Sequence, residues 1–211
     1  MSINPNGKKY LEYSDEELIL SARDDAHAFD AFHQRFLSKI LNYVNRLVGD
    51  YQKAEEITQE TFLQVYRHLD TYRPEGKTSS WLFKIATNLS KNELRNQRRR
   101  NFLGFSLNNK ISNDEQDTEL LELIPDRSHK PDTLAEINEL ADTLEKAINK
   151  LPLKYREVIL ICEVYGYSYQ EASEILNCTK ANVGIRLCRA RRQIKKIIES
   201  MSPHASLRLK R

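Results

Sequence analysis

The sequence changes character abruptly at residue 101, and this change divides the chain into two parts that must fold separately. Between residues 101 and 131 there are six acidic residues against three basic ones, and Asn, Ser and Asp are frequent. Such a stretch is typical of a linker of low order, because it buries too little apolar surface to fold. We therefore expect folded regions over 14–100 and 132–199, with a disordered N-terminus over 1–13 and a basic tail over 200–211.

Both folded regions are expected to be all-α. Only 6 of the 211 residues are glycine, whereas sheets and barrels need turn glycines at short intervals. Apolar residues recur at helical spacing, with no strand-like alternation. Ser14 with Glu17, and Ser168 with Glu171, form capping-box pairs that mark helix starts. The predicted fold is two small helical domains, an N-terminal bundle and a C-terminal helix-turn-helix domain, joined by an acidic flexible linker.

The composition and motifs of the sequence also exclude several classes of protein. The longest apolar run covers residues 158–162, far short of the ~20 residues that span a bilayer, and no apolar signal segment opens the chain. The three cysteines lack CxxC spacing, the five histidines are scattered, and there is no Gly-rich phosphate loop or nucleophile–base pair. We therefore expect a cytoplasmic protein without membrane insertion, metal, cofactor or catalytic residues.

The C-terminal region has the pattern of a helix-turn-helix over residues 168–192. A short helix is followed by a three-residue turn at 177–179 and a long final helix. In the final helix, apolar residues at steps of three and four form a stripe that faces the core. The residues on the opposite side are expected to face outward: Ala181, Ile185, Cys188, Arg189, Arg192 and Lys196.

This final helix is also strongly basic. Between residues 179 and 196 there are seven bases and no acid, although a solvated helix gains stability from interleaved opposite charges. A polyanion is the simplest compensation, so we expect the helix to enter the major groove of DNA. About six phosphate contacts would give the plot of log affinity against log salt a slope of roughly −5. The alternative is an ordinary basic helix on a helical hairpin.

The helix expected over residues 53–69 has two different faces. One face is apolar and belongs to the core, while the other combines acids, an amide and a leucine: Glu56, Gln59, Glu60 and Leu63. A leucine set among acids suggests a docking surface for a basic partner helix. A solvated acidic face is the alternative, and a metal or acid–base site is disfavoured because no histidine lies at ligand spacing.

The helix expected over residues 81–100 mixes amides and bases. Asn88, Asn92 and Arg95 lie four and three residues apart and therefore share a face. Amides suit base edges, and arginines suit phosphates or guanine. Nearby aromatic rings could stack on unpaired bases, although Trp81 is interpreted as core: Tyr66, Tyr72, Trp81 and Phe83. The set favours a nucleic-acid surface, with single-stranded DNA as one possibility.

Four motifs, taken together and in this order, resemble those of the extracytoplasmic-function (ECF) sigma factors of bacterial RNA polymerase. They are AEEITQETF at 54–62, SWLFKIATN at 80–88, LPLKYREV at 151–158 and VGIRLCRAR at 183–191. Each motif alone is weak evidence. The resemblance covers both folded regions and flanks a linker where the family has one.

The resemblance implies a role and its residues. The positions that would dock on the clamp helices of the polymerase β′ subunit are Glu56, Gln59, Glu60 and Leu63. The residues that would hold the melted minus-ten strand are Tyr72, Lys77, Asn88, Asn92 and Arg95. The residues that would read the minus-thirty-five element as duplex are Lys180, Ile185, Arg186, Cys188, Arg189 and Arg192. Other implied contacts are the β flap tip on the apolar surface of the C-terminal domain, the RNA exit channel for the linker, and an anti-sigma factor.

Two departures from the family pattern concern the final helix. Relatives often have a basic or polar residue where Gly184 stands and Ser where Ile185 stands, so upstream readout is expected to depend on Arg186, Arg189 and backbone contacts. Many relatives also have Asp in place of Asn92. An autonomous helix-turn-helix repressor or activator with an N-terminal sensor domain is the alternative function.

Overall fold

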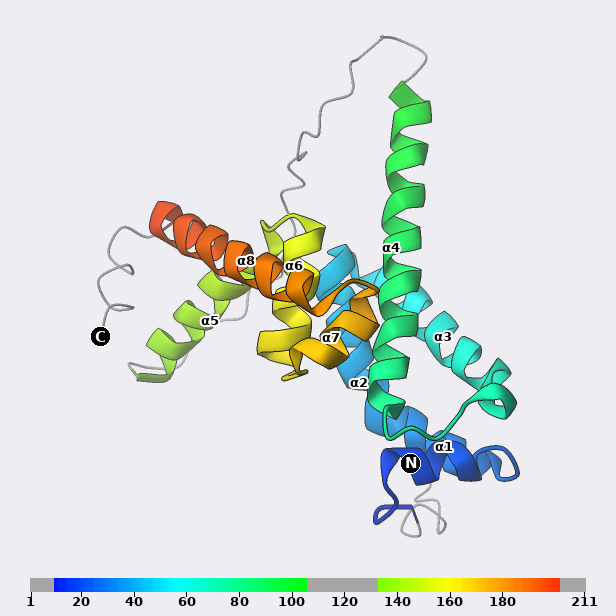
Figure 1. Ribbon diagram of the computed structural model, residues 1–211. Helices are drawn as coiled ribbons and strands as arrows, with labels where there is room; N and C mark the ends of the chain where they lie inside the picture. Colours follow the sequence, from blue (N-terminus) through cyan, green and yellow to red (C-terminus); the bar gives the residue numbers. More distant parts are fainter. Residues whose placement is uncertain (1–9, 106–132, 202–211) are drawn as a thin grey trace.

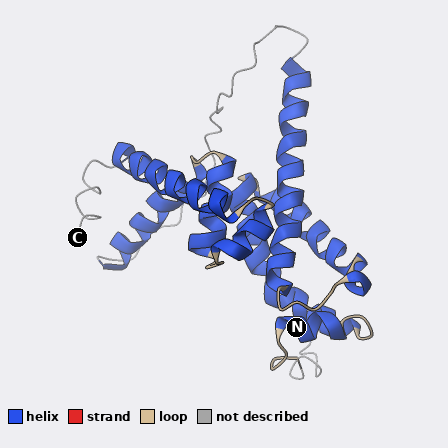
Figure 2. Cartoon of the chain, viewed as in Figure 1, coloured by secondary structure: helices blue, strands red, loops and turns tan. Residues whose placement is uncertain are grey.

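The computed structural model describes residues 10–105 and 133–201, with side chains at 10–102 and 141–201. All regular elements in these ranges are helices (Figure 2), which confirms the predicted all-α class. The expected linker over 101–131 lies outside the described residues from position 106 onward, and so do the tails before residue 10 and after residue 201. Among the described helices, none is long and apolar enough to cross a membrane.

The N-terminal half contains four α-helices and one 3₁₀ turn. They are α1 (Asp15–Ser21), α2 (Ala26–Val48), α3 (Tyr51–Arg67), η2 (Leu69–Thr71) and α4 (Thr78–Phe105). The predicted capping box is present at the start of α1, where Glu17 N donates to Ser14 Oγ at 3.2 Å and Ser14 N donates to Glu17 at 2.7 Å. Gly49 ends α2 in the left-handed conformation, with φ of 75°, where glycine avoids the strain of a Cβ atom.

The folded part of this half is longer at both ends than the sequence indicated. Tyr10 is buried, and the guanidinium of Arg35 donates to the carbonyl oxygens of Tyr10 and Tyr13 at 3.2 and 2.8 Å. Residues 10–13 therefore pack on α2, which the local sequence could not indicate because the contact spans more than twenty residues. At the other end, α4 continues through residues 101–105, because no proline follows Arg100 to stop it.

The C-terminal half contains α5 (Thr133–Asn149), α6 (Leu153–Ile159), the π-helical turn η3 (Leu160–Val164), α7 (Tyr169–Leu176) and α8 (Lys180–Met201). Asn177 ends α7 with φ of 52°, and Asn182 N donates to Thr179 Oγ1 at the start of α8 at 3.2 Å. The predicted helix-turn-helix therefore has the expected turn. In η3, the amide of Tyr165 donates to the carbonyl of Leu160, five residues earlier, at 2.9 Å.

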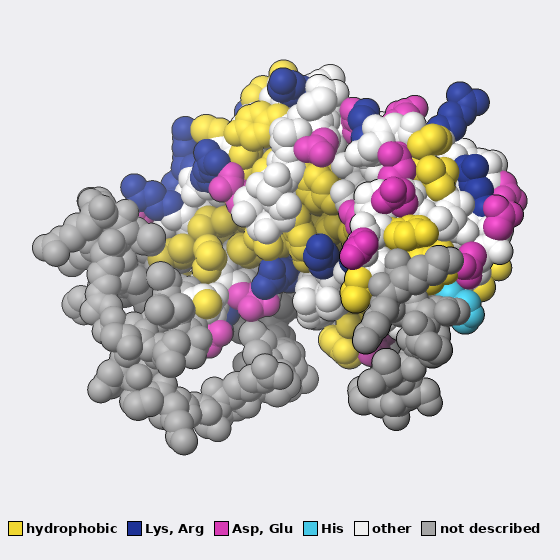
Figure 3. All heavy atoms as spheres, turned by 90° about the horizontal axis from the view of Figure 1, so that it is seen from below, with side chains coloured by type: hydrophobic (Ala, Val, Ile, Leu, Met, Phe, Trp, Pro, Cys, Tyr) yellow, Lys and Arg dark blue, Asp and Glu magenta, His cyan; other side chains and the backbone are white. Residues whose placement is uncertain are grey.

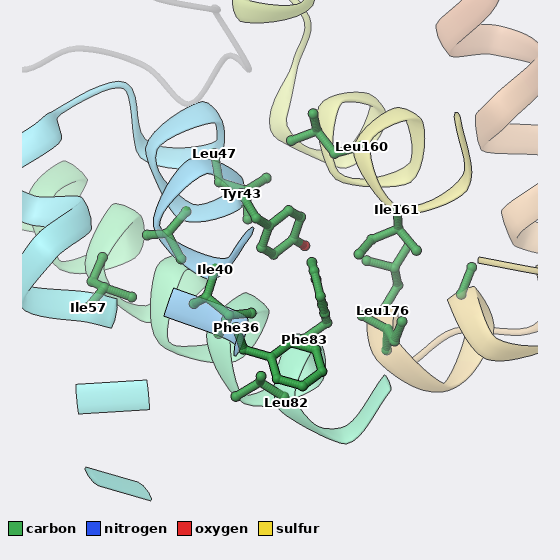
Figure 4. Close-up of a cluster of buried hydrophobic side chains, with 14 of the residues drawn as sticks. Phe36, Ile40, Tyr43, Leu47, Ile57, Leu82, Phe83, Leu160, Ile161 and Leu176 are labelled. Carbon is green, nitrogen blue, oxygen red and sulfur yellow. The ribbon is translucent and has the colours of Figure 1, made fainter. Parts of the chain in front are cut away.

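The two halves share one hydrophobic core. α4 lies alongside α7 (Figure 1), and the buried side chains form a single cluster that crosses between the halves. Tyr43 and Phe83 from the N-terminal half face Leu160, Ile161 and Leu176 from the C-terminal half (Figure 4). The helical regions that the sequence predicted as separate units are therefore packed against each other.

Aromatic rings form the centre of this shared core. The ring of Phe83 lies 5.0 Å from that of Tyr43, 4.9 Å from that of Tyr165 and 5.3 Å from that of Tyr167, between centroids. Offset and edge-on ring pairs of this kind add roughly 0.5–1.5 kcal/mol beyond the area they bury. Phe83 is only 2% exposed, so its ring is buried where the two halves meet.

We predict that Phe83→Ala lowers the free energy of unfolding by about 3–5 kcal/mol, because it leaves a cavity where both halves meet. Urea unfolding of the full chain, followed by circular dichroism, measures this. Phe102→Ala is the matched control, since Phe102 lies on the same helix, is 66% exposed and should change stability by no more than about 0.5 kcal/mol. Equal stability of the two variants would show that the halves do not depend on this ring.

Candidate functional site

The outward face of α3 matches the prediction. The buried side consists of apolar residues and threonines: Ala54, Ile57, Thr58, Thr61, Phe62 and Val65. On the opposite side Glu56 and Gln59 are exposed, Glu60 is half-buried, and Leu63 is 48% exposed. We call Glu56, Gln59, Glu60 and Leu63 the acidic face.

The carboxylates of the acidic face have only local partners. Lys53 Nζ lies 2.7 Å from Glu56 Oε2. Gln64 Nε2 and Arg67 donate to Glu60 Oε1 at 2.7 and 3.2 Å. Exposed pairs of this kind contribute little to stability, so both carboxylates are free to exchange these partners for an external cation. Figure 3, a view from below, shows acidic side chains spread over the N-terminal half, on the right.

An exposed tyrosine adjoins the acidic face. Tyr66 lies one helical turn beyond Leu63 on α3, and its ring packs edge-on against Phe29 at 5.2 Å. Residues three apart on a helix are neighbours, so the spacing of Leu63 and Tyr66 indicates that they adjoin. The ring of Tyr66 was instead interpreted as a candidate for base stacking. Leu63 and Tyr66 together form an apolar strip beside two carboxylates.

A polar row runs along α4. Asn88, Asn92 and Arg95 are all exposed, and Arg95 donates to Asn92 Oδ1 at 3.4 Å. The opposite side of the helix is buried, and there the hydroxyls of Thr87 and Ser90 donate to carbonyls one turn earlier at 2.7 and 2.8 Å. The three predicted residues therefore share one solvent-facing side, with amide and guanidinium groups directed outward.

The loop before α4 differs from the expectation that its aromatic rings are available for stacking. Tyr72 is buried, its ring packs on Trp81 at 4.8 Å, and its hydroxyl is 2.7 Å from Thr78 Oγ1. Burial raises the pKa of Tyr72 above its ordinary value. Phe83 belongs to the shared core, so neither of these rings presents a face to solvent. Lys77, also predicted as a DNA contact, pairs with Glu174 of α7, with Nζ 3.0 Å from Oε2.

The outward side of α8 matches the prediction. Exposed residues there include every one expected to face outward: Ala181, Ile185, Cys188, Arg189, Arg192 and Lys196. Lys180 at the start of the helix is exposed as well. Val183, Leu187 and Ala190 are buried, so the apolar stripe faces the core as expected.

Tyr169 also belongs to this surface, although no pattern in the sequence indicated it. A Cβ atom built on Gly184 would lie 3.7 Å from Cε2 of Tyr169, whose side chain is exposed on α7. The missing side chain at Gly184 thus leaves space beside an aromatic ring from the neighbouring helix. The exposed surface of the helix-turn-helix therefore includes residues from both α7 and α8. Spacing within the sequence of α8 alone cannot predict the contribution of α7.

Arg186 departs from the other predicted contacts in α8. Its guanidinium donates to Glu157 Oε1 at 3.1 Å and to Asn182 Oδ1 at 2.9 Å. Glu157 is only 2% exposed, and its second oxygen pairs with Lys91 Nζ of α4 at 2.8 Å. One buried carboxylate of α6 thus holds a cation from each half of the molecule.

Other polar contacts also join the halves. Arg156 donates to the carbonyl of Leu47 at 3.1 Å, and the hydroxyl of Tyr165 donates to the carbonyl of Lys39 at 3.1 Å. Burial raises the pKa of Tyr165 to about 12, so this hydroxyl stays protonated and remains a donor at neutral pH. Together with the pair of Lys77 and Glu174, these contacts surround the shared core.

Among the described residues, no group of three or more His, Cys, Asp or Glu side chains could hold a metal ion. The thiol of Cys162 is half-buried, and burial raises its pKa to about 11, which disfavours the reactive thiolate. Binding surfaces are therefore the chemically distinctive features of the described parts of the chain.

Comparison with known protein families matches both halves. The model of Sigma-70 region 2 matches residues 32–100, which include the acidic face and the polar row. The model of Sigma-70, region 4 matches residues 141–194, which include the helix-turn-helix. The fold and these surfaces define a sigma factor of RNA polymerase, a regulatory DNA-binding protein of transcription initiation.

Curated relatives specify the family. The chain is 30% identical over 179 residues to the ECF RNA polymerase sigma factor SigW of Bacillus subtilis, covering 85% of this chain and 93% of the relative. It is 29% identical over 188 residues to the RNA polymerase sigma-H factor of Pseudomonas aeruginosa, covering 89% and 95%. The chain belongs to the ECF sigma factors, as its four motifs indicated.

A solved structure has the same fold. The structure of CnrH in complex with the cytosolic domain of CnrY is similar, with a TM-score of 0.62 and 21% sequence identity. The similarity covers 89% of this chain and 99% of that chain. The arrangement of helices described above is thus one that known proteins adopt.

Proposed function

We propose that this chain binds core RNA polymerase and directs promoter-specific initiation, reading the minus-ten element as melted single strand and the minus-thirty-five element as duplex. The observation that carries the proposal is the presence, in one chain, of exposed surfaces of opposite chemistry. The acidic face on α3 suits a basic protein helix, while the outward side of α8 carries only basic charges from Lys180 to Lys196, before the exposed Glu199 near its end. A repressor acting alone would not need the first of these surfaces.

Core polymerase would dock on the acidic face through the clamp helices of its β′ subunit. Leu63 and Tyr66 supply apolar area at the centre of the contact, where interfaces gain most of their affinity. Glu56 and Glu60 supply charge that speeds association with a basic partner and sets its register. The exposed apolar residues of the C-terminal half, Leu144 and Val164, are candidates for holding the tip of the β flap.

The melted minus-ten strand would lie along the polar row of α4. Asn88 and Asn92 can pair with base edges, and Arg95 with a phosphate. Unpaired bases bound in this way would favour the open duplex, because melting requires only that the single strand bind better than the double strand. Such a step needs no catalytic residue and no cofactor.

The upstream duplex would receive α8 in its major groove. Ile185 can contact a thymine methyl group, while Arg189 and Arg192 can bind guanine or phosphates. Arg186 would join them only after leaving Glu157. Tyr169 adds an aromatic ring beside Gly184 to this surface, where it could contact the sugar–phosphate backbone near the helix start.

Lys77 can reach DNA only if the two halves separate, since the packed arrangement pairs it with Glu174 of the other half, as it pairs Lys91 with Glu157. At ~3.3 Å per residue, the segment 106–132 can extend over roughly 90 Å, enough to join elements several helical turns apart. Differential affinity of polymerase and promoter for the separated form would drive this change. A further partner would be an anti-sigma factor, which would favour the packed form. This is supported by the similar solved structures of the sigma factor RpoE in complex with the anti-sigma factor NepR and of CnrH in complex with the cytosolic domain of CnrY.

Replacing Glu56, Gln59 and Glu60 together by alanine should weaken binding to core polymerase by roughly 100-fold, because three contacts at the centre of one interface are lost. Competition with a labelled sigma factor for purified core enzyme measures this, and circular dichroism verifies the fold. The matched control replaces Asp30 and Gln34, an exposed acid and an exposed amide on α2. A triple variant that competes as well as the parent would contradict the docking assignment, and tight, specific duplex binding without core enzyme would favour an autonomous regulator.

Arg192→Ala should reduce the steepness of the salt dependence of promoter binding by about 0.9, the value for one lost phosphate contact. A promoter is first selected from a random duplex library with the reconstituted holoenzyme, and its affinity is then measured over a salt series. Arg191→Ala is the control, because Arg191 pairs with Glu163 at the side of the helix. Identical slopes for Arg192→Ala and the parent would show that the outward side of α8 does not face phosphates.

A zero-length carbodiimide crosslink between Lys77 and Glu174 should form in the free protein and decrease several-fold when core polymerase and the selected promoter are added. The two side chains are 3.0 Å apart and partly exposed, and their hydrogen bond lowers the pKa of Glu174. Mass spectrometry identifies the linked peptides. Lys77→Arg keeps the charge but removes the reactive amine, so its crosslink should be absent. An undiminished yield in the promoter complex would show that the halves stay packed.

A further inference from the structure

The loop between α3 and α4 is held by side chains from α1 and the residues after it, in addition to the backbone hydrogen bonds of the turn η2. It runs from the 3₁₀ turn η2 to Thr78 and includes Gly76 with φ of 65°, a left-handed conformation that glycine adopts without strain. Two long side chains from the α1 region reach across to it: Glu16 and Arg23. These contacts join residues that are about fifty to sixty positions apart in the sequence.

Glu16 fixes the tip of the loop. Its Oε1 accepts a hydrogen bond from the backbone amide of Gly76 at 2.8 Å and one from the hydroxyl of Tyr72 at 3.3 Å. Because a hydroxyl has a single proton, Thr78 is then the donor in its 2.7 Å contact with Tyr72. A chain of hydrogen bonds thus runs from the first turn of α4 to a carboxylate of α1, and bonds to a charged acceptor are the stronger kind.

Arg23 fixes the start of the loop. Its Nε donates to the carbonyl of Leu69 at 3.0 Å, and its terminal nitrogen donates to the carbonyl of Tyr72 at 2.5 Å. The planar guanidinium can bind two carbonyls at once, which a lysine amine cannot do in the same geometry. The two ends of η2 are therefore set by one side chain that follows α1.

α1 is itself firmly placed. Leu18 and Ile19 are fully buried, the capping box closes the helix start, and Asp15 pairs with Arg35 of α2 at 2.9 Å. Because α1 is packed and paired against α2, the contacts of Glu16 and Arg23 fix the position of the loop relative to the helical bundle.

We infer that Glu16 and Arg23 are positioning residues for minus-ten recognition: through the loop they set where its backbone and Lys77 meet the melted strand, without contacting DNA themselves. This inference rests on the proposed function, which assigns the loop and α4 to that strand. A recognition surface must be held to within a fraction of an ångström to discriminate between bases. A loop with a left-handed glycine cannot supply that precision alone, whereas four hydrogen bonds from Glu16 and Arg23, anchored on the helical bundle, can.

The test compares transcription by the reconstituted holoenzyme from the selected promoter and from the same promoter with its most strongly selected minus-ten base replaced. Glu16→Ala and Arg23→Ala should each reduce this discrimination ratio about tenfold, with unchanged affinity for core polymerase. Glu16→Gln should retain most of the ratio, because an amide oxygen still accepts both hydrogen bonds. Glu12→Ala and Asp24→Ala remove exposed acids next to the same helix and should leave the ratio unchanged.

The ratio separates positioning from simple loss of folded protein. A variant that is merely less stable lowers transcription from both promoters in proportion and leaves the ratio as in the parent, and that result would overturn the inference. A parent holoenzyme that shows no preference for the minus-ten base would instead refute the proposed function. If the parent prefers the selected minus-ten base and both alanine variants keep the same discrimination ratio, the positioning role of Glu16 and Arg23 is refuted and the proposed function is not.

Discussion

The packed form of this sigma factor depends on a single buried carboxylate. Glu157 of α6 pairs with Lys91 of α4 and with Arg186 of α8, and a buried charge is costly unless it is compensated in this way. The pairing fixes the position of the C-terminal half on α4 and turns Arg186 away from the outward side of α8. Because the rings of Phe83 and Tyr165 pack against each other between the same two halves, electrostatic and apolar contacts favour the same arrangement.

This arrangement links stability to function. Lys77, a proposed promoter contact, is paired with Glu174 of the other half, so DNA and this interdomain acid would compete for the same side chain. The aromatic rings that meet between the halves lose their partners on separation, which costs free energy in proportion to the apolar area exposed. Polymerase and promoter must supply that free energy together, and a sigma factor that has not met polymerase is expected to remain packed.

Local patterns in the sequence predicted the helices and their faces well, because spacing, capping boxes and turn residues act over a few positions. The acidic face, the polar row and the outward side of α8 all follow from helical geometry. Contacts between distant segments were not predictable in this way. Glu157 lies within a recognised motif, but nothing near it indicates Lys91 or Arg186 as partners. Tyr72 was expected to stack on bases, yet its hydroxyl binds Thr78 and Glu16 in the interior.

The π-helical turn η3 determines how the halves fit. An amide that bonds to a carbonyl five residues earlier inserts one extra residue into a helical turn, which rotates everything beyond it by about 100° relative to an α-helix. This rotation contributes to the directions in which Tyr165 and Tyr167 leave the turn to pack on Phe83. The register of the backbone, rather than side-chain identity alone, therefore encodes the interdomain fit. Deleting the exposed Val164 from this turn would keep every side chain of the shared core and still point the tyrosines away from their partners.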